Sequence, residues 1–294
     1  MTAPAPVPAI ERITTLRATD PAALRHRLLE RPRHPGLAAG DKLLIIAADH
    51  PARGALAAGG KQDAMADRWD LLRRCATALA RPGVAGFLGT ADIVEELAQL
   101  GALDGKLVFG SMNRGGLAST AFELDDRFTG YDARGVEEAG LDGGKMLLRI
   151  DGEDHATART LEACAQAVDS LAERGLTAMV EPFLSTRVHG QVRNVLTADA
   201  VIKSVAITSG LGRTSAHTWL KLPVVTDMER VMAASTLPAL ILGGDVPEDP
   251  KAAARSWSRA VRLPGVLGLV IGRSLLYPAD GNVAGAVDRA VGLL

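Results

Sequence analysis

Short apolar runs alternate with helix-like stretches along nearly the whole chain, and this alternation constrains the fold more than any other feature. Strands that alternate with helices form a parallel sheet. Eight such units within 294 residues favour closure into a (β/α)8 TIM barrel. The eight strands are expected at residues 42–48, 84–88, 106–109, 144–150, 177–182, 218–226, 239–244 and 266–273.

An open, doubly wound sheet is the alternative for the same alternation. Dinucleotide-binding sheets of that kind carry Gly-x-Gly-x-x-Gly after the first strand, and the sequence has no such motif there. A helix is expected over residues 20–31, with Asp20 as its N-cap and Pro21 at its first position. We therefore expect a short N-terminal helical extension over residues 1–40 and a single catalytic barrel over residues 41–294.

Composition excludes several classes of partner. The net charge of −1 and an aromatic content of 3% indicate neither nucleic-acid nor membrane binding. Residues 1–10 read as a low-complexity tail rich in Ala and Pro, without the features of a signal peptide. The two cysteines, Cys75 and Cys164, fall in helix-like segments and indicate a reducing compartment. We expect a cytoplasmic homo-oligomer that holds no metal and no cofactor.

Lys221 stands near the middle of the apolar run at 218–226. Lysine is rarely buried, because desolvation disfavours its ammonium form and leaves a free amine. A free amine can attack a carbonyl and form a Schiff base. A lysine that snorkels from the strand end or pairs with an acid is the alternative. The chain has only 7 lysines against 26 arginines, so an amine inside a strand hints at a chemical need.

Other polar residues stand in the predicted strands or at their ends. Since catalytic groups in such barrels come from the C-terminal ends of the strands, we expect these residues to meet at one mouth. The candidates for catalysis are Lys221, Lys145, Glu181 and Asp49. Alternatives remain for each of them: Asp49 could cap a turn, Lys145 could point to solvent, and Glu181 could neutralise an arginine.

Glycines and an arginine follow the last two strands. Loops at this place in a barrel often hold a phosphate with backbone N–H groups, and an arginine adds a fork of donors. A purely structural arginine is the alternative. The predicted phosphate-binding residues are Gly243, Gly244, Gly272 and Arg273.

The chain resembles the class I (β/α)8 aldolases of the tagatose-bisphosphate, sulfofructose-phosphate and archaeal-type fructose-bisphosphate group. It resembles deoxyribose-phosphate aldolase more distantly. The resemblance covers roughly residues 43–294. It rests on five short motifs in the same order: Asp49 in Ala-Ala-Asp-His-Pro, Lys145 in Gly-Lys-Met-Leu-Leu, Glu181 in Val-Glu-Pro, Lys221 in Leu-Lys-Leu-Pro-Val, and Arg273 in Ile-Gly-Arg. It implies that Lys221 forms the Schiff base and that the Gly-Arg pair clamps a phosphate.

The chain departs from the family after the first strand. Tagatose-type members carry Asp-Gln-Arg-Gly there, whereas this chain has Asp-His-Pro-Ala-Arg-Gly. It also resembles an aldolase-like protein encoded beside inositol-catabolism genes in high-GC bacteria. That resemblance implies cleavage of 2-deoxy-5-keto-gluconate 6-phosphate into dihydroxyacetone phosphate and malonate semialdehyde. The carboxylate of this substrate would need further cations. The substrate-binding candidates are therefore His50, Arg53, Arg114 and Arg187, although the arginines could be surface charges.

The sequence is also compatible with several other functions. One is another sugar-phosphate aldolase of the deoxyribose-phosphate, sulfofructose-phosphate or tagatose/fructose-bisphosphate type. A metal-dependent aldolase would need His and carboxylate ligands, and the six histidines show no His-x-x-His-like spacing. A sugar-phosphate isomerase or epimerase would use acids without an imine. A non-catalytic sugar-phosphate-binding barrel is the last alternative, because fold alone does not decide function.

Overall fold

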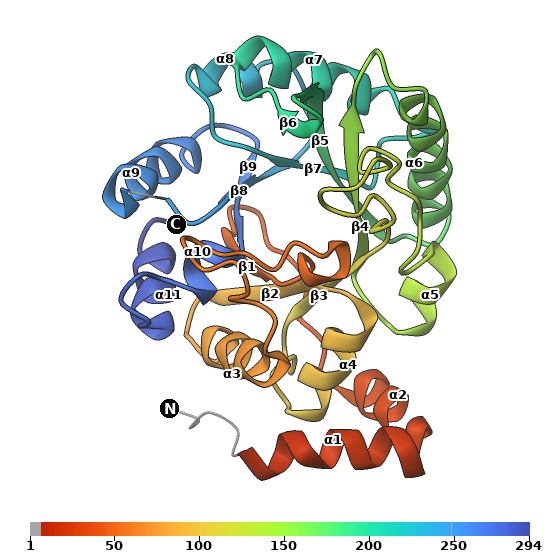
Figure 1. Cartoon of the computed structure of the whole chain (residues 1–294), viewed down its shortest axis with the longest axis vertical. Coiled ribbons are helices and arrows are strands. Elements are labelled where there is room, and N and C mark those ends of the chain that lie inside the picture. The colour runs from red at the N-terminus through yellow and green to blue at the C-terminus, as the bar shows by residue number, and fades with distance from the viewer. Residues whose placement is uncertain (1–6, 248) are drawn as a thin grey trace.

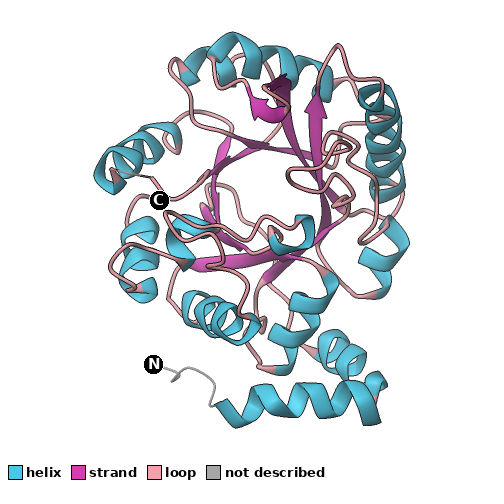
Figure 2. Cartoon of the chain, viewed as in Figure 1, coloured by secondary structure: helices cyan, strands magenta, loops and turns pink. Residues whose placement is uncertain are grey.

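The computed structural model of the chain describes residues 7–247 and 249–294. Its eight parallel strands form the closed barrel that the alternation predicts: they are ordered β4-β3-β2-β1-β9-β8-β7-β5, and β4 pairs with β5 to close the ring. Figure 2 shows this ring of strands inside an outer ring of helices. The strands of the barrel are β1 (Leu43–Ala47), β2 (Val84–Gly89), β3 (Leu107–Ser111), β4 (Gly143–Ile150), β5 (Thr177–Val188), β7 (Thr218–Leu222), β8 (Ala239–Leu242) and β9 (Val266–Ile271).

The helices follow the strands in alternation and cover the outside of the barrel (Figure 1). Asp67, Asp132, Thr197 and Asn282 each accept a backbone N–H at the start of a helix, so side-chain caps set these starts. The helices of the barrel are η1 (Pro51–Arg53), α3 (Arg68–Leu79), α4 (Ala91–Gln99), α5 (Ala133–Glu138), α6 (Ala156–Ala172), α7 (Ala198–Ser209), α8 (Met228–Met232), α9 (Pro250–Ala260), α10 (Arg273–Leu276) and α11 (Val283–Val291).

Successive residues of each strand face alternately into the barrel and out toward the helices. In β1, Leu43 and Ile45 join the cluster inside the barrel, whereas Leu44 and Ile46 join the larger cluster between strands and helices. Phe109 and Trp219 meet inside with their ring centroids 5.9 Å apart. Because the inward residues fill the barrel, only its C-terminal mouth is left for polar chemistry.

Two helices precede the barrel and lie outside it; the second packs against α4, and the first packs against the second (Figure 1). The second, α2 (Pro21–Glu30), has Asp20 at its N-cap position as predicted, although the side chain makes no capping bond there. The first, α1 (Val7–Thr19), begins inside the stretch that the sequence reads as a tail, so that prediction was wrong for its described part. Burial of Ile13 and ion pairs from Arg17 to α4 hold α1 in place. Residues 1–6 of the predicted tail lie outside the described residues.

The segment after the fifth strand of the barrel is not the loop that the sequence predicts over 183–194. Strand β5 continues past the barrel to Val188 and pairs in antiparallel fashion with β6 (Gln191–Asn194). His189 and Gly190 both have positive φ angles, 50° and 78°, as a two-residue hairpin turn requires. The result is a β-hairpin that stands at the mouth of the barrel.

The predicted long loop after β3, residues 111–130, is present, and backbone contacts fold it back on itself. Gly130 donates to the Met112 carbonyl at 2.9 Å, and Gly115 donates to the Arg127 carbonyl at 3.0 Å. Together these contacts hold the loop over the mouth. No helix among the described residues is long and apolar enough to cross a membrane.

Candidate active site

The inward alternation of the strands continues past the apolar core and places polar side chains at the mouth. On β4, for example, Lys145, Leu147 and Arg149 follow one another at a period of two, and all three line a cleft of about 710 Å³. Of the site residues predicted from the sequence, the cleft is lined by Asp49, His50, Arg53, Arg114, Lys145, Glu181, Lys221, Gly243, Gly244, Gly272 and Arg273. Arg187 is not among the residues that line it.

Four of these residues form one chain of ion pairs, which we call the lysine cluster: Asp49, Lys145, Glu181 and Lys221. The Nζ of Lys221 lies 3.2 Å from Oε1 of Glu181, and the other carboxylate oxygen of Glu181 pairs with Lys145. The Nζ of Lys145 lies 3.3 Å from Oδ2 of Asp49. Lys145 is 1% exposed and Lys221 is 4% exposed, so two amines share one carboxylate in a desolvated site.

Arg114 closes the far end of this cluster. Its Nη2 pairs with Oδ2 of Asp49, and its Nε donates to the Ser111 hydroxyl at 2.9 Å. The same hydroxyl donates to Asp49 at 3.2 Å. The buried guanidinium of Arg114 is therefore committed to protein partners, although the sequence analysis expected it to bind substrate.

The charges of this cluster act on one another. Burial alone would raise the pKa of Asp49, but Arg114, Lys145 and Lys221 outweigh it and hold that pKa well below its usual range. Burial likewise opposes ionisation of Glu181, and the two lysines overcome it and lower the pKa to about 2. Burial and the nearby Arg114 lower the pKa of Lys145 to about 8. Of these three groups, only Lys145 changes its proton state close to neutral pH.

The ends of β8 and β9 form another part of the cleft. Gly244 has a φ of 69°, in the left-handed region that favours glycine. A Cβ atom on Gly272 would lie 2.4 Å from the carbonyl oxygen of Ala47, so close packing against β1 demands glycine there. These glycines leave the backbone of both turns accessible to a ligand in the cleft.

Arg273 and its neighbour Ser274 carry unpaired polar atoms at this end. Nη1 of Arg273 pairs with Oδ2 of Asp245 at 3.1 Å. Within the described residues, its Nε and the Ser274 hydroxyl are buried without a hydrogen-bond partner. A buried polar group without a partner costs about 1–3 kcal/mol. An anion bound beside the accessible glycine backbone would accept hydrogen bonds from these unpaired donors and so remove this cost.

His50 links this end to the lysine cluster. Its Nδ1 lies 3.8 Å from Oδ1 of Asp49 and has no hydrogen-bond partner among the described residues. Burial lowers the pKa of His50 to about 3, so the ring is neutral at physiological pH. Residues 7–247 and 249–294 contain no group of three or more His, Cys, Asp or Glu side chains placed to hold a metal ion.

The three arginines expected to bind a second anion occupy different places. Arg53 is half-buried and lines the cleft, whereas Arg114 is tied to Asp49. Arg187 lies on the hairpin, where its Nη2 donates to the Ala121 carbonyl at 2.8 Å and sits 3.4 Å from Asp154. The structure therefore brings Arg53 into the cleft and directs Arg187 to the loop after β3.

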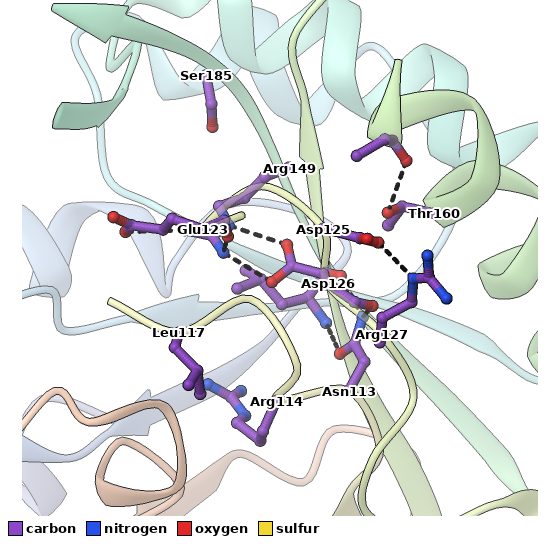
Figure 3. Close-up of polar contacts among 12 residues, drawn as sticks. Asn113, Arg114, Leu117, Glu123, Asp125, Asp126, Arg127, Arg149, Thr160 and Ser185 are labelled. Carbon is purple, nitrogen blue, oxygen red and sulfur yellow. Dashed lines mark hydrogen bonds and ion pairs between the residues drawn. The ribbon is translucent and has the colours of Figure 1, made fainter. Parts of the chain in front are cut away.

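A second buried charged group, which we call the arginine cluster, was not predicted from the sequence: Glu123, Asp126 and Arg149. Figure 3 shows Arg149 facing both acids, with Nη2 2.7 Å from Oδ1 of Asp126 and Nη1 3.2 Å from Glu123. The period of two from Lys145 to Arg149 could have predicted its inward direction. Its acids come from the long loop, where no periodicity marks them. Arg193 and Asn194 of the unpredicted β6 also line the cleft.

Comparison with known proteins places the chain in one family. The sequence model of the Cgl0159-like family matches residues 41–291. The crystal structure of Cgl0159 from Corynebacterium glutamicum is 52% identical in sequence, with a TM-score of 0.95 over 98% of this chain and 97% of that one. No curated protein matches the sequence.

More distant solved structures share the fold. A Schiff-base-forming fructose-1,6-bisphosphate aldolase is 17% identical, with a TM-score of 0.62 over 92% of this chain and 99% of that one. A fructose-bisphosphate aldolase from Slackia heliotrinireducens is 15% identical, with a TM-score of 0.61 over 86% and 85% of the two chains. At such identities the likeness concerns the fold, and it confirms the predicted (β/α)8 barrel.

Proposed function

The chain belongs to the Cgl0159-like family, and we propose that its barrel catalyses class I aldolase chemistry with Lys221 as the Schiff-base lysine. One observation carries this proposal: the Lys221 amine lies in the cleft, 4% exposed, and shares the Glu181 carboxylate with a second buried lysine. A structural lysine needs one counter-ion and no cavity. Two amines around one acid at a cleft suit a group that must give up its proton and attack a carbonyl.

The reaction begins when the free amine of Lys221 adds to the substrate ketone and loses water to give an iminium. The bond between the carbon adjacent to the iminium carbon and the next, hydroxyl-bearing carbon then breaks, and its electron pair forms the C=C bond of an enamine as the iminium nitrogen becomes neutral. The hydroxyl on the carbon that departs loses its proton, so this fragment leaves as an aldehyde. Protonation of the enamine and hydrolysis by water then release the ketone and restore Lys221.

Lys145 is the better candidate for the proton transfers than either acid of the cluster. An efficient general acid or base has a pKa near the working pH. Burial and Arg114 lower the pKa of Lys145 to about 8, whereas the two lysines lower the pKa of Glu181 to about 2, and Arg114 and the lysines hold the pKa of Asp49 well below its usual range. We therefore assign proton transfer to Lys145, and we assign to Glu181 and Asp49 the positioning of the two amines.

The β8–β9 end of the cleft is the proposed phosphate site. Gly243, Gly244 and Gly272 expose backbone there, and Arg273 supplies a guanidinium. Holding a remote phosphate lets binding energy position the reacting carbons over Lys221. Asp245 would have to release Arg273, since the two pair at 3.1 Å, and its exposed carboxylate makes that exchange inexpensive.

As substrate we propose 2-deoxy-5-keto-gluconate 6-phosphate, cleaved to dihydroxyacetone phosphate and malonate semialdehyde. Its open-chain ketone suits Lys221, and its phosphate suits the β8–β9 end. The motifs that resemble the aldolase-like protein of inositol-catabolism clusters support the same choice. Other phosphorylated keto-sugars meet the first two requirements, so the aldehyde fragment is what distinguishes this substrate.

The condensation direction tests this function. The protein is incubated with dihydroxyacetone phosphate and malonate semialdehyde, and the six-carbon phosphorylated acid is sought by mass spectrometry, with Lys221→Arg as the matched variant. We expect product from the native chain and none from the variant. Product with another aldehyde only would keep the chemistry and change the substrate. Isomerised sugar phosphate without any carbon–carbon bond formation would overturn the aldolase proposal.

A further inference from the structure

We propose that Arg53 forms a second anion site in the cleft, which binds a carboxylate on the substrate fragment that leaves as the aldehyde. This inference rests on the proposed function for the identity of that fragment. The site itself follows from the arrangement of the arginines around the cleft. It predicts that the enzyme selects substrates with a negative charge at both ends.

Arg53 is a cation without a partner. Its half-buried side chain lines the cleft, and its guanidinium makes no hydrogen bond or ion pair with residues 7–247 or 249–294. Its backbone is held firmly, because its N–H donates to the His50 carbonyl at 3.0 Å and its carbonyl accepts from Ala118 at 2.8 Å. A fixed backbone that presents an unpaired guanidinium to a cleft is a site prepared for a ligand.

The two neighbouring arginines already have acid partners. Arg114 is paired with Asp49, and Arg149 is held by Asp126 and Glu123 (Figure 3). Burial lowers the pKa of Arg53 to about 10, and the charges of Arg149 and Arg114 add to this effect. An anion beside Arg53 would relieve that repulsion and replace the water that the half-buried group has lost.

Arg53 adjoins the loop after β3, because its carbonyl accepts from Ala118 of that loop at 2.8 Å. The charged groups that act on it are Arg149, Arg114, Asp126 and Glu123, which all belong to β4 or the loop after β3. By contrast, the charge of Arg273, at the β8–β9 end, contributes to the lowered pKa of His50. A substrate whose phosphate sits at β8–β9 and whose ketone meets Lys221 therefore directs its other end toward Arg53.

The surroundings of Arg53 favour a carboxylate over a second phosphate. A single guanidinium offers two parallel N–H donors, which match the two oxygens of a carboxylate. Glu123 and Asp126 stand nearby and would repel a doubly charged phosphate more strongly than a singly charged carboxylate. The aldehyde fragment is thus an acid rather than a second sugar phosphate.

Two open-chain ligands without a carbonyl group test the site independently of imine chemistry. 6-Phosphogluconate and glucitol 6-phosphate differ only in a carboxylate against a hydroxymethyl group at the end far from the phosphate. Titration calorimetry on the native chain should show at least roughly tenfold tighter binding of 6-phosphogluconate, as a charge-assisted hydrogen bond provides. Arg53→Gln should abolish the preference. Arg213→Gln, which removes an exposed guanidinium outside the cleft, should keep it.

Each outcome bears on the proposal. Equal binding of the two ligands to the native chain would overturn it, as would a preference that survives in folded Arg53→Gln. If Arg53 serves instead as a counter-charge for the arginine cluster, Arg53→Gln will lower the melting temperature without changing any preference, and the proposal is wrong. A clear preference with no condensation product would retain the anion site and reject the aldolase function.

Discussion

The lysine cluster and the arginine cluster are both buried, both built from acids and cations, and both at the mouth of the barrel, yet they differ in the kind of cation they hold. Arg149 binds its acids through the planar fork of its guanidinium. Lys145 and Lys221 carry compact amines, and they share a single glutamate. We propose that only the lysine cluster is reactive, because an amine can act as a nucleophile whereas a guanidinium serves to bind its acids.

The two clusters also differ in what they hold in place. Arg149 ties the loop after β3 to β4, and Asn113 reinforces that tie by exchanging two hydrogen bonds with the backbone of Leu147. The lysine cluster joins four strands that the barrel already fixes. Loss of the arginine cluster should therefore show in stability, and loss of the lysine cluster should show in turnover.

The largest expected effect belongs to Lys221. Replacing it with Ala removes the nucleophile, so turnover should fall by about four orders of magnitude or more. The fold should persist, because Glu181 keeps Lys145 as its partner. Steady-state kinetics and circular dichroism measure the two properties. Lys203→Ala removes an exposed lysine and serves as the control. Near-normal turnover in Lys221→Ala would refute the Schiff-base account.

The next effect, on stability, belongs to Arg149. Arg149→Met leaves Asp126 and Glu123 without their cation, and breaking a buried pair in this way costs about 3–5 kcal/mol. Urea unfolding measures the loss. Arg213→Met, which breaks exposed pairs with Asp169 and Glu173, should cost only about 0–1 kcal/mol. If the two variants lose similar amounts of unfolding free energy, the arginine cluster does not have the structural role assigned to it.

Lys145 should matter for proton transfer rather than for imine formation. Lys145→Met should lower turnover by about 10²–10⁴-fold, the usual contribution of a general acid or base. The variant should still form an adduct at Lys221 when it is reduced with borohydride in the presence of a ketone. Rapid-quench measurements give the rate of imine formation and the rate of proton transfer separately. Loss of the adduct together with turnover would mean that Lys145, and not only Lys221, is required for attack.

Arg114 offers a finer test of the same cluster. Burial and Arg114 lower the pKa of Lys145, so Arg114→Gln should raise that pKa above about 8. Cleavage that needs the free amine of Lys145 increases as pH rises through this pKa. The rising limb of the kcat/KM profile should therefore move to higher pH, by about one pH unit. An unchanged limb with lower activity would mean that Arg114 acts only by holding Asp49.

The strands and the lysine cluster could be predicted because a buried strand has a period that the sequence displays. Lys145, Glu181 and Lys221 are polar exceptions in apolar runs, and parallel strands bring their C-terminal ends to one mouth. The barrel closes as that pattern requires. Closure of the barrel depends on a strand pattern that the sequence repeats eight times. The pairing of individual side chains has no such repeated pattern.

What the sequence could not predict depends on contacts between distant segments. Hairpin β5–β6 requires a tight turn at His189, and one histidine with a positive φ angle has no clear sequence signal. Arg53, Arg114 and Arg187 look alike in the sequence, and only the position of their acids separates the free arginine from the paired ones. Contacts between distant segments decide whether an arginine is paired with an acid or free to bind a ligand. From the sequence alone, each of these arginines therefore remains a candidate for substrate binding.

Borohydride reduction with dihydroxyacetone phosphate, followed by intact mass and peptide mapping, tests the central claim most directly. The account predicts one stable adduct, located on Lys221 and absent from Lys221→Ala, with Lys145 unmodified. An adduct on Lys145 would exchange the roles of the two amines. No adduct with dihydroxyacetone phosphate or any other carbonyl compound would contradict the claim that the lysine cluster is built for imine chemistry.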